Sequence, residues 1–332
     1  MQALMFQERR RMEMREVDAP FPGPGEAIVE VAACGVCGSD LEGYVGTPGM
    51  ADRRVPPLLL GHEFAGTVLE GPDEWLGRAV AIHPLVTDGS CRFCRSGRRY
   101  LCPNRELIGL NRPGALAQQV VVPLSGLHAL PEGVPQWRGA LAEPLAVAVH
   151  AVELAGPLLE REVLVFGGGA IGFFVAWAAR RAGAKVQVID ISDTRREQAA
   201  ALGIASADAP QGEVDVTFDT VGIEATRAAA ITHLAPGGTA VFVGLHDDES
   251  PFSFYGLILQ ERQVRGSYCY SDQDFARAVS LCGEVPDDYI AHVPLQEGAS
   301  AFDALAAGSS EYLKVLLEPD GPSLSEVSPT CT

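Results

Sequence analysis

The hydrophobic pattern of the chain changes character at about residue 160. Before that point, short strand-like runs are separated by proline and glycine, as in AIVEVAACGVC, GHEFAGTVLEG and AQQVVVPL. Helical periodicity appears in this half only between about Trp137 and Leu154. The first 150 residues are therefore predicted to be rich in strands and loops.

After residue 160, strand-like and helix-like segments alternate. VLVFGGG is typical of a buried strand entering a glycine turn, AIGFFVAWAARRAG of a helix, and KVQVIDIS of a second strand. The alternation continues through REQAAALG, VDVTFDTVG, TRAAAITHLA and TAVFVGL, and the last dozen residues read as a loose tail. Such alternation indicates an α/β fold with a doubly wound parallel sheet covered on both faces.

Length and charge narrow the class of protein. A chain of 332 residues with 47% hydrophobic residues predicts two domains with a sizeable core. Its formal net charge of −18 argues against binding to nucleic acid or to an anionic membrane surface. The N-terminal segment lacks the apolar region of a signal peptide, and no run of 18 apolar residues occurs, so we expect a cytoplasmic protein.

The segment GGGAIG at residues 167–172 fits the dinucleotide-binding pattern G-x-G-x-x-G. The pattern alone is weak in a chain with 36 glycines, but here it follows a strand and opens a helix, as its mechanism requires. Gly167 permits the tight turn, Gly169 lets the backbone approach a pyrophosphate, and Gly172 lets the helix pack on the strand. We assign cofactor contacts to this loop and to the turns after later strands, at Gly167, Gly169, Ala170, Ile171, Gly172, Asp190, Arg195, Val221 and Gly244.

Asp190 follows the second strand, 18 residues after Gly172, where a carboxylate accepts hydrogen bonds from ribose hydroxyls. Because a 2′-phosphate would be repelled there, NAD is favoured over NADP. The alternative role for Asp190 is to cap the helix that starts near Thr194. Arg195 and Arg196 keep NADP open, since an arginine can hold a 2′-phosphate.

Two groups of residues are candidate metal ligands. Cys37, His62, Glu63 and Glu143 are far apart in the sequence, as the ligands of a catalytic zinc often are. No spacing rule identifies such a set, and a lone His–Glu pair such as His62 and Glu63 is more often structural than metal-binding. Asp88, Cys91, Cys94 and Cys102 form a compact second group, because three thiolates need one more ligand to close a structural zinc site. The alternative for this group is a degenerate lobe without metal.

Five segments occur in the order and spacing of the medium-chain zinc dehydrogenases: VAACGVCGSDL, LLLGHEFAGTV, the cysteine-rich segment, LAEPLAVAVHA and VLVFGGGAIG. The chain most resembles their sorbitol and threonine dehydrogenase branch, and the resemblance runs from MQALMF to YLKVLLEP. It implies a β-rich GroES-like catalytic domain with a zinc lobe, a Rossmann NAD-binding domain and a return to the catalytic domain before the tail, at residues 1–148 with the lobe at 88–102, 149–288 and 289–332.

The resemblance also implies roles for single residues. Cys37 and His62 match zinc ligands, Glu63 matches the carboxylate that ligates zinc in the polyol branch, and Glu143 matches an acidic residue at the zinc. Ser39 is similar to the hydroxyl that relays the substrate proton, and Asp40 to the carboxylate that orients the zinc-bound histidine.

Two positions depart from the family pattern. Asp88 stands where the family lobe has its first cysteine, which puts the occupancy of that lobe in doubt. Glu42 stands where related enzymes often carry a histidine at the solvent end of the proton relay, so the route of the relay is open. Cys34 matches an apolar-packed cysteine of the family, and we expect it in the core rather than in a redox pair with Cys37.

Together these features predict a zinc-dependent oxidoreductase that moves hydride between NAD and a secondary alcohol, polyol or sugar-derived alcohol. The homo-oligomer expected in this family is a dimer or tetramer. The rival hypotheses are a zinc-independent quinone or enone reductase of the same fold, a non-catalytic NAD-binding protein and a nucleic-acid-binding zinc module. The substrate is open, and Arg53 and Arg54 are candidates to contact an anionic group on it, although most such arginines are solvated.

Overall fold

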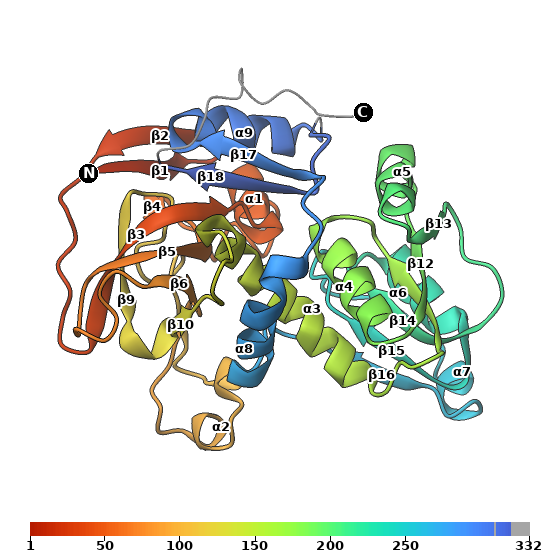
Figure 1. Cartoon of the computed structure of the whole chain (residues 1–332). Helices are drawn as coiled ribbons and strands as arrows, with labels where there is room; N and C mark the ends of the chain where they lie inside the picture. Colours follow the sequence, from red (N-terminus) through yellow and green to blue (C-terminus); the bar gives the residue numbers. More distant parts are fainter. Residues whose placement is uncertain (309, 320–332) are drawn as a thin grey trace. The chain divides into compact units, whose positions relative to one another are not determined.

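The computed structural model describes residues 1–308 and 310–319, and the chain divides into two compact units (Figure 1). Unit 1 comprises Met1–Glu143 and resumes at Phe275, whereas unit 2 comprises Pro144–Asp274. The sequence had placed the boundaries after residues 148 and 288. Residues 320–332, most of the expected tail, lie outside the described residues.

Unit 1 is dominated by short antiparallel strands, as the first half of the sequence indicates. A sheet of seven strands has the order β10-β6-β5-β3-β18-β17, with β9 also paired to β3, and smaller sheets are β2-β1-β4 and β7-β8. The strands are β1 (Gln2–Glu8), β2 (Arg11–Glu16), β3 (Glu26–Gly35), β4 (Leu58–Leu59), β5 (Glu63–Glu70), β6 (Ala79–Ile82), β7 (Leu85–Val86), β8 (Glu106–Leu107), β9 (Gln119–Pro123), β10 (Leu127–Ala129), β17 (Ile290–Pro294) and β18 (Lys314–Glu318).

The helices of unit 1 are short, and a hydrophobic core packs against its strands. Phe6, Phe64 and Phe302 are fully buried in that core, which joins strands from both ends of the chain. The helices and helical turns are α1 (Gly38–Val45), α2 (Arg92–Arg95), α9 (Gly298–Ala306), and the 3-10 turns Arg99–Leu101, Leu124–Gly126, Gln136–Leu141, Cys282–Glu284 and Leu295–Glu297.

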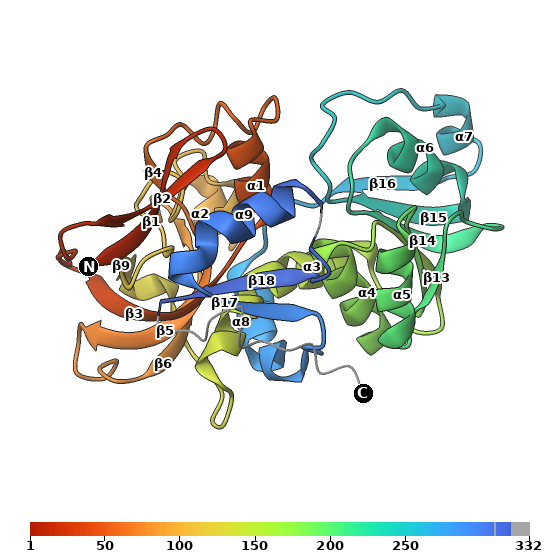
Figure 2. The ribbon, with the colours of Figure 1, turned by 90° about the horizontal axis from the view of Figure 1, so that it is seen from above.

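Unit 2 contains one parallel sheet of six strands in the order β13-β12-β11-β14-β15-β16. In chain order this is 3-2-1-4-5-6, the doubly wound arrangement that the alternating pattern predicts. Figure 2 shows α4 and α5 on one face of the sheet and α6 on the other. The elements are β11 (Glu162–Phe166), α4 (Ala170–Arg181), β12 (Lys185–Ile189), α5 (Asp193–Ala201), β13 (Ala205–Ala207), β14 (Val214–Asp219), α6 (Glu224–Thr232), β15 (Leu234–Phe242), α7 (Phe254–Ile258) and β16 (Gln263–Gly266).

Two helices run across the boundaries between the units, α3 (Ala142–Ala155) and α8 (Asp272–Leu281). The helix expected from Trp137 is in fact split, because residues 136–141 form a 3-10 turn and the α-helix starts only at Ala142. Pro144 is accepted in the first turn of α3, where a backbone N–H has no helical partner in any case.

Candidate metal centre and cofactor loop

The register of the large sheet in unit 1 brings three distant segments together. β3 lies between β5 and β18, with Gly35 opposite Glu63 on one side and opposite Leu316 on the other. The chain leaves β3 at Gly35 and reaches Cys37 at the start of α1, while His62 directly precedes β5. Cys37, His62 and Glu63 therefore meet at one edge of paired strands although they are far apart in the sequence.

These three side chains form a compact group, which we call the buried site. One ligand atom of each lies within 4.8 Å of the others. His62 and Glu63 are buried, with 5% and 1% of their surface exposed, whereas Cys37 is partly exposed. One thiolate, one imidazole and one carboxylate are the ligand types that zinc accepts, so the set fits that metal.

Asp40 orients the histidine of the buried site. Its Oδ2 lies 3.3 Å from His62 Nδ1, which leaves Nε2 as the ring nitrogen for a metal. Burial alone would raise the pKa of Asp40, but the charges of His62 and Arg54 and their hydrogen bonds lower it to about 2. Burial would likewise lower the pKa of His62, but the negative charges of Asp40 and Cys37 raise it well above its ordinary value. The surroundings of His62 therefore favour positive charge, which a divalent cation supplies.

A lysine that sequence reasoning missed closes the buried site on the other side. Lys314, the first residue of β18, is 4% exposed; it forms an ion pair with Glu63 Oε2 and donates to the Val36 carbonyl at 2.9 Å. Burial would lower the pKa of Lys314, but Glu63, Cys37 and Glu143 raise it. A Cβ atom on Gly35 would lie 2.3 Å from Glu63 Oε2 and 2.8 Å from Lys314 Cε, so the glycine makes room for this pair.

A signal for this lysine does exist in the sequence. Lys314 and Lys185 are the only two lysines of the chain, and Lys314 stands inside the apolar run YLKVLLEP. A charged side chain at a strand position that the pattern assigns to the core needs a buried partner of opposite charge.

Glu143 is buried in the first turn of α3, 9% exposed, and its charge contributes to the raised pKa of Lys314. Among the described residues it does not join the closely spaced ligand group of Cys37, His62 and Glu63. Glu42 is half-buried on α1. Cys34 is fully buried in the core, as predicted.

Ser39 stands between the buried site and an arginine. Its hydroxyl donates to Cys37 Sγ at 3.2 Å and accepts from Arg54 Nη2 at 2.7 Å. The interpretation of Arg54 as a solvated arginine was wrong, because this side chain is 3% exposed and also donates from Nε to Asp40 at 2.7 Å. Arg53 is exposed.

The second ligand group, residues 88–102, is called the cysteine lobe below. Ligand atoms of Asp88, Cys91, Cys94 and Cys102 lie within 4.8 Å of one another, and Cys91 and Cys94 place their sulfurs 3.5 Å apart without a disulfide. Asp88 Oδ1 accepts from the backbone N–H groups of Ser90 and Cys91 at 2.9 Å, so the turn itself fixes the carboxylate.

Hydrogen bonds set the charge state of the lobe. The backbone N–H of Cys91, the side chain of Asn104 and the N–H of Ser90 hold the pKa of Asp88 well below its usual range. Desolvation raises the pKa of the Cys94 thiol to about 11, whereas the backbone N–H of Cys94 lowers that of Cys91. Three thiols and an ionised carboxylate make a closed set of four ligands that fits zinc.

The glycine loop of unit 2 has the geometry that its sequence predicts. Gly167 has a φ of +97°, a conformation that favours glycine in this tight turn. A Cβ on Gly172 would lie 1.8 Å from the Gly167 carbonyl oxygen, so only glycine lets α4 approach the strand end. A Cβ on Gly169, at the N-cap of α4, would meet nothing within 4 Å, which leaves open space beside the helix N-terminus where Ala170 and Ile171 begin α4. An N-terminus of this kind accommodates a phosphate.

Asp190 follows β12 and ties it to the glycine loop. Its Oδ2 accepts from the Gly168 N–H at 2.6 Å and its Oδ1 from the Ser192 N–H at 2.8 Å. The cap of α5 is Ser192, which accepts from the Arg195 N–H, so the alternative of Asp190 as the helix cap was wrong. Arg196 donates to the Asp190 carbonyl at 2.7 Å and pairs with Asp193.

The turns after β14 and β15 touch each other near the remaining predicted cofactor residues. Val221 donates from its N–H to Asp219 Oδ1 at 3.0 Å. A Cβ on Gly244 would lie 2.3 Å from the Gly222 nitrogen, so Gly244 permits this backbone contact.

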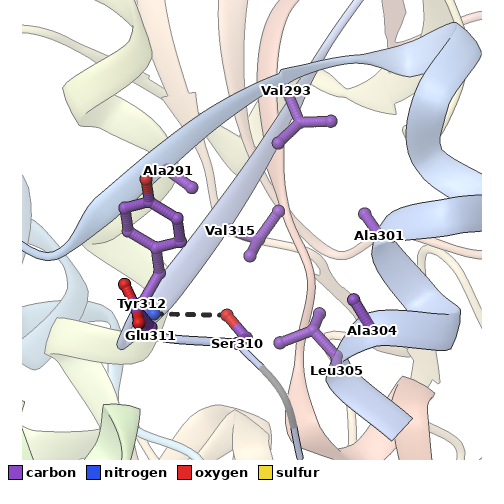
Figure 3. Close-up of a pocket in the computed structure, with 9 residues that line it drawn as sticks. All are labelled: Ala291, Val293, Ala301, Ala304, Leu305, Ser310, Glu311, Tyr312 and Val315. Atoms are coloured by element: carbon purple, nitrogen blue, oxygen red, sulfur yellow. Dashed lines mark hydrogen bonds between the residues drawn. The ribbon is translucent and has the colours of Figure 1, made fainter. Parts of the chain in front are cut away.

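A cavity of about 310 Å³ lies elsewhere in unit 1, between β17, β18 and α9 (Figure 3). Its lining is mostly apolar: Ala291, Val293, Ala301, Ala304, Leu305, Ser310, Glu311, Tyr312 and Val315. Neither ligand group contributes a residue to it, so the cavity is separate from the metal chemistry.

No helix within residues 1–308 and 310–319 is both long enough and apolar enough to cross a membrane.

The sequence of this chain matches two known protein-family profiles and many dehydrogenases. The alcohol dehydrogenase GroES-like domain profile matches residues 23–132, and the zinc-binding dehydrogenase profile matches residues 170–284. The 2-dehydro-3-deoxy-L-galactonate 5-dehydrogenase of Pseudoalteromonas atlantica is 32% identical over 325 residues, covering 91% of this chain and 94% of that protein. The L-threonine 3-dehydrogenase of Pyrococcus horikoshii is 33% identical over 266 residues, covering 74% and 76%.

Solved structures share the whole architecture. A protein of Sinorhizobium meliloti whose crystal structure contains NADP superposes with a TM-score of 0.87 at 29% identity, covering 96% of this chain and 99% of that chain.

Proposed function

The chain belongs to the GroES-like, zinc-binding family of alcohol dehydrogenases, and on that premise we propose that it oxidises a secondary hydroxyl of a polyol or sugar acid with NAD. The predicted family, its threonine dehydrogenase branch and its α/β fold are confirmed. The observation that carries the proposal is the convergence of Cys37, His62 and Glu63 beside Ser39 and Asp40.

The buried site supplies the acid chemistry of the reaction. Cys37, His62 and Glu63 would hold a zinc ion, with Glu143 buried in the first turn of α3, and a zinc bound there would act as the Lewis acid that polarises the alcohol oxygen. Ser39, directly beside Cys37, accepts the proton of the substrate hydroxyl as its own proton moves on toward solvent. Asp40 fixes the tautomer of His62, and Lys314 balances the charge of Glu63.

The cofactor is NAD rather than NADP in this proposal. Asp190 follows β12 and is hydrogen-bonded to the glycine loop, which supports its assignment to the ribose hydroxyls; a 2′-phosphate bound there would be repelled by its negative charge. Of the two arginines that keep NADP open, Arg196 donates to the Asp190 carbonyl and pairs with Asp193, and Arg195 donates to Gln198 Oε1 at 3.1 Å. The glycine loop at Gly167, Gly169 and Gly172 holds the pyrophosphate at the start of α4.

A second zinc is proposed for the cysteine lobe, with a structural role. Asp88, Cys91, Cys94 and Cys102 supply all four ligands of a closed site, which leaves no position for substrate. Reduced thiols this close together are expected in the cytoplasm, where we place the protein.

The assembly proposed is a homo-oligomer built on the outer edge of unit 2. β16 is the edge strand of the six-stranded sheet, and its four residues are exposed. Next to it in the chain, Tyr255, Ile258 and Leu259 are 80%, 67% and 77% exposed, an apolar surface of the kind that marks an interface. Tyr255→Glu is expected to shift the protein to monomers in light scattering; an unchanged mass would contradict this interface.

The function is tested by NAD reduction over a panel of polyols, sugar acids, sugar phosphates and amino alcohols, with metal content measured per chain. Cys37→Ala is expected to abolish turnover and lose one zinc while NAD binding and the lobe zinc remain. Cys34→Ala is the matched control, since Cys34 lies in the core and should keep both metal and activity. Full activity in zinc-free protein would disprove the proposal.

A further inference from the structure

Arg54 is a buried arginine that donates a hydrogen bond to Ser39, the proposed proton acceptor. It lies in the loop between α1 and β4, with 3% of its surface exposed. Its Nε donates to Asp40 Oδ1 at 2.7 Å, its Nη2 donates to Ser39 Oγ at 2.7 Å, and its Nη1 lies 3.7 Å from Met50 Sδ. A planar guanidinium thus uses its fixed fork of donors on two neighbours at once.

Each of these two neighbours contacts a different proposed metal ligand. Asp40 reaches His62 through its second oxygen at 3.3 Å, and Ser39 donates its hydrogen to Cys37 Sγ at 3.2 Å. Arg54 is therefore hydrogen-bonded both to the carboxylate that contacts His62 and to the hydroxyl proposed to accept the substrate proton.

The fold makes specific room for this arginine. A Cβ atom on Gly43 of α1 would lie 2.3 Å from Arg54 Cδ and 2.9 Å from its Cβ. Ser39, Asp40 and Gly43 lie within two turns of α1, so the stem of Arg54 passes over the glycine to reach the other two. The backbone N–H of Arg54 donates to the Met50 carbonyl at 3.1 Å, which fixes the loop that carries it.

We propose that Arg54 is a positioning residue that locks the Ser39 hydroxyl and the Asp40 carboxylate in their working orientations. A serine hydroxyl has one hydrogen and two lone pairs and rotates freely unless its neighbours fix it. Arg54 occupies one lone pair, so the hydrogen turns to Cys37 and the second lone pair is left to accept from the substrate alcohol. This inference rests on the proposed function for the role of Ser39.

The chemistry of Arg54 also excludes this residue from the route of the proton. A guanidinium has five donors, no acceptor, and stays protonated at all working pH values. Arg54 therefore takes no proton from Ser39: as Ser39 accepts the substrate proton, its own hydrogen leaves the bond to Cys37 Sγ and passes to water, on the proposed route toward solvent. It also follows that Arg54 is not a contact for an anionic substrate, because its side chain is 3% exposed and is bonded to Asp40 and Ser39.

Three variants test the role of Arg54 at different levels. Arg54→Lys keeps the charge but not the fork, since one ammonium does not reproduce two donors at fixed angles. Arg54→Met removes charge and fork together. Gly43→Ala keeps the arginine at position 54 but displaces its aliphatic side-chain carbons. Arg15→Met is the matched control, an arginine of the same unit that is half exposed and paired with Glu13.

The expected result is a loss of kcat of about tenfold or more in Arg54→Lys and Gly43→Ala, with KM and NAD affinity nearly unchanged. With cobalt(II) in place of zinc, the visible absorption of the buried site is expected to shift in both variants and not in Arg15→Met. Thermal unfolding of each variant shows whether the fold is retained, and Arg54→Lys carries the test if Arg54→Met does not fold.

The proposal is overturned if Arg54→Lys and Gly43→Ala keep both the wild-type kcat and the wild-type cobalt spectrum. It is equally overturned if KM alone rises, because that result assigns Arg54 to substrate binding. Failure of the wild-type protein to oxidise any alcohol would instead refute the proposed function, and the cobalt spectra would still report on Arg54 independently.

Discussion

The buried site and the cysteine lobe both gather candidate metal ligands in unit 1, but different interactions hold the two sets in place. Those of the buried site come from the start of α1 and the start of β5, and buried charges surround them. The ligands of the lobe come from one stretch of residues 88–102, and backbone N–H groups fix its carboxylate.

The two aspartates show what this difference means physically. Asp40 and Asp88 both have a lowered pKa, but burial opposes the shift at Asp40 and the charges of His62 and Arg54 win. At Asp88 hydrogen bonds from Cys91, Asn104 and Ser90 produce the shift on the surface. The buried site thus depends on charge balance across the fold, and the lobe depends on local turn geometry.

Removing the charge of Lys314, the partner of Glu63 in the buried site, should have the largest effect on stability. Lys314→Met leaves Glu63 buried without its partner and is expected to lower the free energy of unfolding by about 3–5 kcal/mol, measured in urea with chelator present. Lys185→Met is the matched control, because this exposed lysine pairs with Glu160 and Glu162 at 3.5 and 3.7 Å and contributes at most about 1 kcal/mol. Equal losses in the two variants would contradict the dependence of the buried site on its buried ion pair.

The next largest effect concerns pH. The pKa of Asp40 falls from 3.8 to about 2 on folding, so its contribution to stability is present above pH 4 and is lost as the pH falls toward 2. With chelator present, Asp40→Asn is expected to be less stable than wild type by about 2 kcal/mol at pH 5, and the gap should close toward pH 2. A gap that stays constant with pH would show that the charge of Asp40 is not responsible.

In the lobe, the choice of fourth ligand should change metal affinity rather than global stability. Asp88→Cys is expected to tighten zinc binding about tenfold, and Asp88→Asn to weaken it by a similar factor, because thiolate is the softer and stronger ligand and a neutral amide the weaker. Chelator competition measures this affinity. Turnover should stay unchanged in both variants, and a loss of turnover that follows zinc loss from the lobe would remove the distinction between the sites.

The smallest effect is expected at a glycine of the lobe. Gly97 has a φ of +75°, and a Cβ there would meet nothing within 4 Å, so Gly97→Ala costs only the strained backbone, about 1 kcal/mol. Gly61, beside His62, has a φ of +104° and would place a Cβ 2.7 Å from Cys34 Sγ. Gly61→Ala should therefore destabilise more, and thermal unfolding of the two variants compares them.

The local parts of this molecule could be predicted from its sequence. The glycine loop, the strand and helix order of unit 2 and the grouping of Asp88 with three cysteines depend on residues that are close in the chain, where spacing carries the information. The grouping of Cys37 with His62 and Glu63 needed the resemblance to a family, because strand register brings them together and spacing does not.

What the sequence did not predict depends on pairing across the sheet. Lys314 reaches Glu63 only because β18 pairs with β3, and Arg54 turns inward only because Gly43 leaves space for its stem. A charge in the sequence does not show whether its partner is water or a buried carboxylate. The hydrophobic pattern near Trp137 likewise did not show that residues 136–141 form a 3-10 turn before the α-helix starts at Ala142.

The position of Lys314 in the chain also has a consequence for the order of events during synthesis. Cys37, His62 and Glu63 and the four candidate ligands of the cysteine lobe have all been made once residue 102 is reached. Glu63 gains Lys314 as its partner only when β18 pairs with β3. We therefore expect both ligand sets to be present during synthesis before the charge of Glu63 is balanced.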